Sequence, residues 1–149
     1  MENGDTQTIL VPTDFSTGSD AALDQAVLMA KATGAGVALV HVIEPAIEFP
    51  LGAAYPDMDG GYYAAVDLAL SARAAKIEKA GLRCTTKILE GPVTSEITRW
   101  ARELGASMIV LGTHGRTGLS HILLGSVAEK TVRHASCPVL TVPCARKAA

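Results

Sequence analysis

The stretch SMIVLGTHGRTGLSHILLGSV, residues 107–127, joins an apolar run to a glycine-rich segment. Its first residues predict a buried strand, because they are continuously apolar from Met108 to Leu111. Four glycines come after this run, and three of them, Gly112, Gly115 and Gly125, form a spaced pattern that ends in Ser126. In α/β proteins, a ligand site lies beyond the end of such a strand, where the next helix begins. The stretch therefore predicts an α/β fold with a site at this position.

Apolar runs predict four further strands. Continuous runs at 8–12 and 36–43, like the one at 107–112, are typical of parallel strands that are covered on both faces. The run at 82–89 alternates with polar residues, and the run at 138–143 is bounded by prolines. Both patterns suit the edge of a sheet, where one side is exposed and a missing N–H breaks no ladder.

Helical repeats separate these strands. Apolar residues recur at i, i+3, i+4 and i+7 in four segments, which begin at Leu23, Ala65, Ile97 and Ala128. Three glycines lie just past these helices, where a left-handed C-cap is favoured: Gly34, Gly81 and Gly105. The alternation predicts a single doubly wound five-stranded parallel sheet with helices on both faces. Residues 45–62 are expected to be a long loop, and residues 1–149 one domain.

Composition excludes several classes of function. With 48% hydrophobic and 19% charged residues and a net charge of −2, the chain has no cationic stripe for nucleic acid. It lacks the roughly 20 apolar residues of a membrane span and the pattern of a signal peptide, so a cytoplasmic location is expected. The cysteines at 84, 137 and 144 show no CxxC spacing, which favours reduced thiols that are structural or incidental.

The glycine-rich stretch favours an anion as ligand. Glycine lets backbone N–H groups approach an anion and permits a positive φ where a loop doubles back. Gly125 and Ser126 open the last helix, whose free N–H groups attract phosphate, and the Ser126 hydroxyl adds a donor. The order of residues is not that of a Walker A loop, which ends in Gly-Lys-Ser/Thr. If the first and fourth strands are neighbours, residues 12–19 face the same crevice.

These motifs resemble the universal stress protein family. The resemblance rests on the spacing Gly112-x2-Gly115-x9-Gly125-Ser126, on Pro12-Thr13-Asp14-Phe15-Ser16 after the first strand and on His41-Val42 in the second. It extends roughly from Thr8 to Pro143. It implies the strand order 3-2-1-4-5 and a site for ATP, or another adenine nucleotide, that binds together with Mg²⁺.

The resemblance also implies roles for individual residues. The backbone of Val42 would recognise adenine, and Asp14 would hold the ribose or a divalent metal bound to the phosphates. The residues that would wrap the ribose and phosphates are Gly112, Gly115, Gly125, Ser126 and Val127. Further candidates for the nucleotide site are Pro12, Thr13, His114 and Arg116, of which the arginine suits phosphate oxygens best.

Several of these residues have a structural alternative. Ser126 could be only a helix N-cap, and Asp14 only a carboxylate that favours the start of the first helix. Gly112 and Gly115 could be turn glycines, and the side chains of His114 and Arg116 could be solvated. Ser16 is most simply the N-cap of the first helix. The histidines at 41, 121 and 134 have no spacing for a zinc site or a catalytic triad, so they are interpreted as structural.

We expect an ATP-binding stress-response or regulatory protein that acts as a nucleotide-dependent switch. Hydrolysis should be slow at most, because Asp14 and Arg116 are too few for fast phosphoryl transfer. One alternative is a nucleotide-independent dimeric interaction module. Another is an ATP-consuming enzyme of the adenine-nucleotide α-hydrolase group, suggested faintly by the sequence TGSD at 17–20. The apolar edge strand predicts a homodimer through Val139–Val142.

Overall fold

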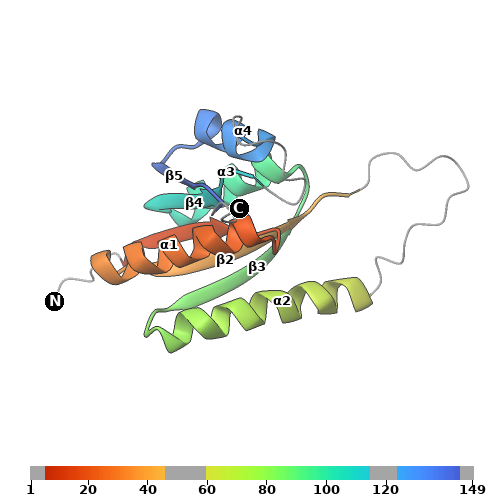
Figure 1. Ribbon diagram of the computed structural model, residues 1–149. Coiled ribbons are helices and arrows are strands. Elements are labelled where there is room, and N and C mark those ends of the chain that lie inside the picture. The colour runs from red at the N-terminus through yellow and green to blue at the C-terminus, as the bar shows by residue number, and fades with distance from the viewer. Residues whose placement is uncertain (1–5, 46–59, 115–123, 145–149) are drawn as a thin grey trace, which may run out of the picture.

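Five parallel strands form one sheet between two layers of helices (Figure 1). The computed structural model describes residues 6–45, 60–114 and 124–144. The strands are β1 (Thr8–Pro12), β2 (Gly36–Ile43), β3 (Cys84–Glu90), β4 (Met108–Gly112) and β5 (Val139–Val142). Their order, β3-β2-β1-β4-β5, confirms the predicted fold, with β3 and β5 at the edges.

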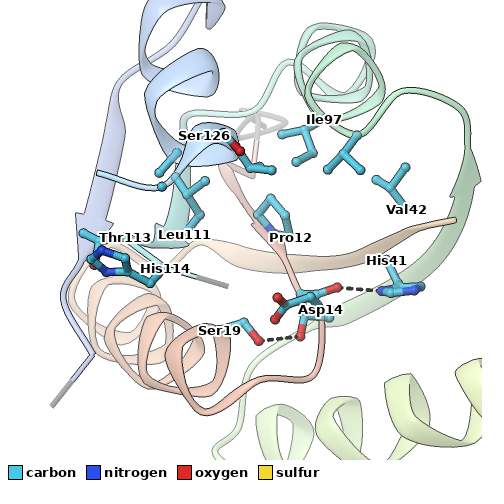
Figure 2. Close-up of a pocket in the computed structure, with 16 residues that line it drawn as sticks. Pro12, Asp14, Ser19, His41, Val42, Ile97, Leu111, Thr113, His114 and Ser126 are labelled. Carbon is cyan, nitrogen blue, oxygen red and sulfur yellow. Dashed lines mark hydrogen bonds between the residues drawn. The ribbon is translucent and has the colours of Figure 1, made fainter. Parts of the chain in front are cut away.

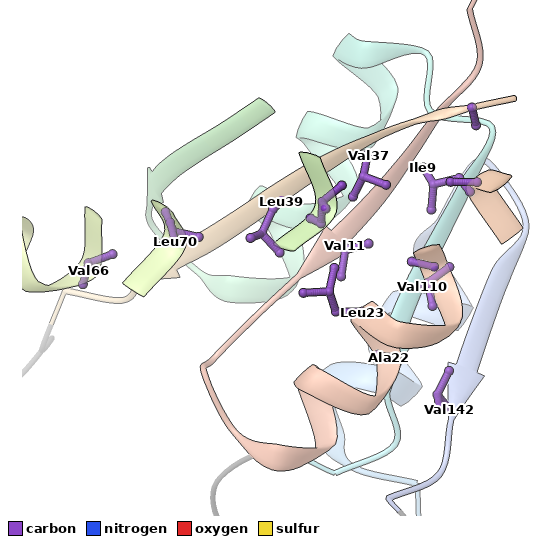
Figure 3. Close-up of a cluster of buried hydrophobic side chains, with 14 residues drawn as sticks. Ile9, Val11, Ala22, Leu23, Val37, Leu39, Val66, Leu70, Val110 and Val142 are labelled. Atoms are coloured by element: carbon purple, nitrogen blue, oxygen red, sulfur yellow. The ribbon is translucent and has the colours of Figure 1, made fainter. Parts of the chain in front are cut away.

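Two helices cover each face of this sheet. The helices are α1 (Thr17–Thr33), α2 (Gly60–Lys79), α3 (Val93–Leu104) and α4 (Ser126–His134). The apolar faces of α1 and α2 pack in one buried cluster, where Leu23 and Leu70 lie against the strands (Figure 3). The apolar faces of α3 and α4 pack in a second cluster around Ile97 and Ala128. Each central strand contributes alternate side chains to the two clusters, as expected of a strand covered on both faces.

Local signals account for most helix ends. Ser16 is the N-cap of α1, and its side chain accepts the Ser19 N–H at 3.2 Å. Gly34 and Gly105 are left-handed C-caps with φ of 75° and 60°, as predicted. Gly81, with φ of 82°, follows α2 in the same way.

Two predicted boundaries are wrong by a few residues. β3 begins at Cys84 and not at Leu82, because the Leu82 N–H still donates to the carbonyl oxygen of Ile77 and so completes the end of α2. The loop predicted over 45–62 ends earlier, since α2 begins at Gly60. Residues 46–59 of that loop lie outside the described residues.

The winding of the chain reverses between β1 and β4. Leu10 pairs with Ala38 of β2 on one side and with Ile109 of β4 on the other. The connections from β1 and from β4 therefore leave the sheet side by side at its carboxyl edge, which is where ligands bind in open parallel sheets. None of the helices in the described residues is long and apolar enough to cross a membrane.

Candidate nucleotide-binding site

A cavity of about 310 Å³ opens at the carboxyl ends of β1 and β4 (Figure 2). Residues predicted for the nucleotide site line it from three strand ends and from the start of α4. They are Pro12, Thr13, Asp14, Val42, Gly112, His114, Gly125, Ser126 and Val127. The two other predicted residues, Gly115 and Arg116, lie outside the described residues.

Apolar side chains form one wall of the cavity. Leu111 comes from β4 and Val42 from β2, while Val93 and Ile97 come from α3 and Ala128 from α4. Sequence reasoning missed the contribution of α3 altogether, although the helical repeat placed Ile97 on a buried face. An apolar wall beside a few polar groups is typical of pockets that take a flat organic ring.

The turn after β1 is held by its own side chains. The Thr13 hydroxyl accepts the Phe15 N–H at 3.0 Å and lies 3.0 Å from the Ser19 hydroxyl. The Asp14 carboxylate accepts the Ser16 N–H at 3.0 Å through Oδ1. Thr13 is buried, so its hydroxyl serves the fold, whereas Asp14 is partly exposed and lines the cavity.

Three glycines allow backbone segments distant in sequence to touch. A Cβ on Gly18 would stand 2.6 Å from the carbonyl oxygen of His114, and a Cβ on Gly112 would stand 2.9 Å from that of Gly18. A Cβ on Gly125 would stand 2.7 Å from the carbonyl oxygen of Thr113. All three distances are shorter than any real side chain accepts, so the starts of α1 and α4 can pack against the end of β4 only with glycine at these positions.

This packing corrects part of the predicted role of the glycines. Neither Gly112 nor Gly125 has the positive φ that glycine permits in a loop, and Gly125 has φ of −58°. Their lack of a side chain serves close backbone contact. Close backbone contact also explains the glycine at position 18. The sequence TGSD at 17–20 therefore needs no phosphate ligand to account for it.

The start of α4 presents backbone donors to the cavity. Gly125 is the N-cap and no side chain caps the helix, so Ser126 is not the N-cap. The Gly125 N–H donates to the Thr113 carbonyl oxygen at 2.7 Å and is therefore used within the fold. The N–H groups of Ser126, Val127 and Ala128 have no partner within the helix, because the first turn of any helix leaves them unpaired. All three residues line the cavity.

The histidines near the site make local contacts. His41 Nδ1 lies 2.7 Å from the Thr13 carbonyl oxygen, and His114 Nδ1 lies 3.0 Å from the hydroxyl oxygen of Thr113 (Figure 2). The Nε2 atom of His114 is buried and has no hydrogen-bond partner among the described residues. His134 Nδ1 lies 2.8 Å from the Lys130 carbonyl oxygen, one helical turn away, and His121 lies outside the described residues.

The charged groups at the site are few. Asp14 is the one carboxylate among the described residues that line the cavity, and no lysine or arginine is among them. Across the described residues, no three His, Cys, Asp or Glu side chains are grouped to hold a metal ion. A metal at Asp14 would therefore need further oxygen ligands from a bound phosphate chain or from water.

Comparisons with known proteins identify the family. The family described as Universal stress protein family matches residues 6–143. Universal stress protein MJ0531 of Methanocaldococcus jannaschii is 36% identical over 136 residues, which cover 90% of this chain and 80% of that protein. Universal stress protein YxiE of Bacillus subtilis is 31% identical over 149 residues, covering 90% of this chain and 97% of that protein. The crystal structure of a universal stress protein in complex with cAMP matches with a TM-score of 0.70 and 26% identity, covering 94% of this chain and 98% of that one. The strand order, the cavity and these matches together show that the chain belongs to the universal stress protein family.

Proposed function

We propose that this chain is a regulatory protein that binds ATP, or another adenine nucleotide, in the cavity between β1 and β4. The observation that carries the proposal is the pairing of an apolar wall with the uncapped start of α4 in one cavity. The wall suits a base, and the helix start suits phosphate. The related universal stress protein solved with cAMP supports an adenine nucleotide as the class of ligand.

The placement of the nucleotide follows from the two ends of this cavity. The base would lie against Val42 and Ile97. The phosphate oxygens would accept hydrogen bonds from the free N–H groups of Ser126 and Val127. Asp14 fits a role at Mg²⁺, because a single carboxylate can hold an ion whose other ligands are phosphate oxygens and water. Mg²⁺ would neutralise phosphate charge in a cavity whose described lining has no lysine or arginine.

The same lining favours a switch over a fast enzyme. Rapid phosphoryl transfer needs a positioned base and cations at the γ-phosphate, and the described lining has one carboxylate, Asp14, and no lysine or arginine. We therefore propose that nucleotide occupancy, with at most slow hydrolysis, is the state that a partner reads during a stress response. The three cysteines are free thiols, which supports a reducing location such as the cytoplasm.

The test uses a variant that stays folded. A carboxylate in the first turn of a helix favours the helix dipole, so Ser126→Asp should keep or raise the urea midpoint. The same charge repels phosphate, so this variant should lose ATP binding measured by titration calorimetry with Mg²⁺. Denaturation of the purified wild-type protein should release an adenine nucleotide that mass spectrometry detects, and the denatured variant should release none. Wild-type protein that ignores millimolar ATP, or Ser126→Asp that binds as well as wild type, would refute the proposal.

A specific observation also favours assembly into a homodimer. β5 is an edge strand, and its outer side has no pairing strand among the described residues. Unpaired edges of apolar strands invite pairing with another chain. We propose that Val139–Val142 meets its twofold copy, whether or not nucleotide is bound.

A further inference from the structure

The turn that carries Asp14 contains a strained residue. Phe15 has φ of 64°, in the left-handed region that bulky residues rarely adopt. It lies between Asp14 and Ser16, whose N–H donates to the Asp14 carboxylate at 3.0 Å. If Phe15 relaxed to a negative φ, the Asp14 carboxylate would leave its place at the cavity. Other parts of the fold must therefore hold Phe15 where it is.

Two side chains from other elements hold Phe15. The His41 ring of β2 stacks on the Phe15 ring, with centroids 4.6 Å apart and an interplanar angle of 25°. The Arg73 guanidinium of α2 lies 5.0 Å from the centre of the same ring. One Arg73 nitrogen also donates to the Phe15 carbonyl oxygen at 3.3 Å. Phe15 is thus contacted at its ring by His41 and Arg73 and at its backbone by Arg73.

Arg73 is itself fixed in position. It donates to both carboxylate oxygens of Asp20 in α1, at 2.7 Å and 3.1 Å. The Arg73 side chain is 17% exposed, so it is well confined, whereas that of Asp20 is 47% exposed. An ion pair with so exposed a partner contributes little to global stability. Its main consequence is to orient a guanidinium that already contacts the turn.

We infer that Arg73 is a positioning residue for the candidate nucleotide site, holding the Asp14 turn in its strained conformation and coupling α2 to the bound ligand. The inference rests on the proposed function, because it gives the regulation of that same site. Coupling between two sites is reciprocal. A nucleotide that engages Asp14 therefore tightens the contact between α2 and the turn, and α2 becomes the element through which occupancy is transmitted.

The principal test compares two substitutions that remove one positive charge from α2. Arg73→Gln should weaken ATP binding roughly fivefold to thirtyfold, the fold-change that corresponds to the strain of one left-handed residue. Lys76→Gln, at an exposed position of the same helix, should bind as wild type does. In the protein without nucleotide, nuclear magnetic resonance should show faster exchange of the Ser16 amide proton in Arg73→Gln and not in Lys76→Gln.

A rescue experiment separates positioning from a direct effect of charge. Glycine adopts a positive φ without steric cost, so Phe15→Gly added to Arg73→Gln should restore part of the lost affinity. If Arg73 acted only as a cation near the phosphates, Phe15→Gly would not restore the ATP affinity. Arg73→Lys keeps the charge but loses the two-point contact with Asp20, and it should rank between wild type and Arg73→Gln.

The outcomes keep the two proposals distinct. Wild-type protein that does not bind ATP would overturn the proposed function. Wild-type binding with unchanged affinity in Arg73→Gln would overturn the positioning role alone. Unchanged exchange of the Ser16 amide in Arg73→Gln would overturn it as well, without reference to any nucleotide. If Arg73→Gln fails to fold, the same readouts on Arg73→Lys decide the question.

Discussion

The backbone N–H of Gly125 donates to the carbonyl oxygen of Thr113 at 2.7 Å, and a Cβ on Gly125 would stand 2.7 Å from that same oxygen. The start of α4 is therefore docked onto the end of β4 through its backbone. This contact fixes where the free N–H groups of Ser126 and Val127 lie relative to the cavity. The last glycine of the motif thus places the start of α4 beside the cavity, while its own N–H is already used within the fold.

This contact predicts that Gly125→Ala is destabilising. The added methyl group forces backbone atoms apart, and overpacking of this kind costs about 1–3 kcal/mol of unfolding free energy. Urea denaturation should show a lower midpoint, and ATP affinity should fall with it. Gly60→Ala is the matched control, because nothing lies within 4 Å of a Cβ there. Equal midpoints for the two variants would contradict the packing role.

Asp14→Asn should separate the charge of Asp14 from its place in the turn. The amide oxygen of asparagine can still accept the Ser16 N–H, so the urea midpoint should change little. If Asp14 holds Mg²⁺, wild type should bind ATP more tightly with Mg²⁺ than with a chelator, by about tenfold, and the variant should lose this difference.

A role at the ribose would give a different pattern. Asp14→Asn would then weaken binding equally with and without Mg²⁺, because a ribose hydroxyl donates to the carboxylate in either condition. Calorimetric titrations in both conditions distinguish the two roles. Affinities that match wild type in both would exclude Asp14 from ligand binding.

Much of the fold could be predicted from periodicity because the central strands are covered on both faces. Continuous apolar runs marked β1, β2 and β4, and alternation marked β3 as an edge. The order of the strands came from resemblance to a family, since periodicity carries no information about which strands are neighbours. The sheet confirms that order.

The parts of the site that could not be predicted from the sequence depend on contacts between residues far apart in the chain. The close approach of Gly18 to Gly112 joins residues far apart in sequence, so the reason for either glycine appears only in three dimensions. Val93 and Ile97 reach the cavity because of how α3 lies on the sheet, which a helical repeat does not determine. The contact of Arg73 in α2 with Phe15 in the turn after β1 also joins residues far apart in sequence, and no motif contains both.

The cysteines should differ in reactivity. Burial raises the pKa of the Cys84 thiol from 9.0 to about 11, and the charge of Glu78 acts in the same direction. Burial also raises the pKa of Cys137, although a backbone hydrogen bond at Ile109 opposes it. Cys144 is exposed. Because the thiolate is the reactive form, a disulfide reagent at pH 8 should modify Cys144 first, as peptide mapping would show.

The raised pKa of Cys84 also predicts a pH dependence of the free energy of unfolding. A thiol whose pKa is raised by folding favours the folded state below its unfolded pKa, and this contribution is lost as pH rises through the folded value. The urea midpoint should therefore fall between about pH 9 and pH 11 in wild type, and it should fall less in Cys84→Ala. Modification of Cys84 as fast as Cys144, or identical pH profiles for the two proteins, would contradict this account.

The outer side of β5 exposes the backbone of alternate residues. The carbonyl oxygens of Pro138 and Val142 accept the N–H groups of Ile109 in β4 and of Thr113 just after it, at 2.9 Å and 3.0 Å. Backbone groups of successive residues in a strand point to opposite edges, so Thr141 directs its N–H and carbonyl oxygen away from β4. That N–H is available to a second copy of the strand.

Thr141→Pro should therefore convert a dimer into a monomer. Proline removes the outward N–H but leaves the ladder with β4 intact, which is why edge strands tolerate it. Thr141→Val is the control, because it keeps the N–H and the shape of the side chain. Sedimentation velocity at equal concentrations should give a dimer for wild type and Thr141→Val, and a folded monomer for Thr141→Pro. A monomeric wild-type protein, or a Thr141→Pro variant that stays dimeric, would show that β5 is not the interface.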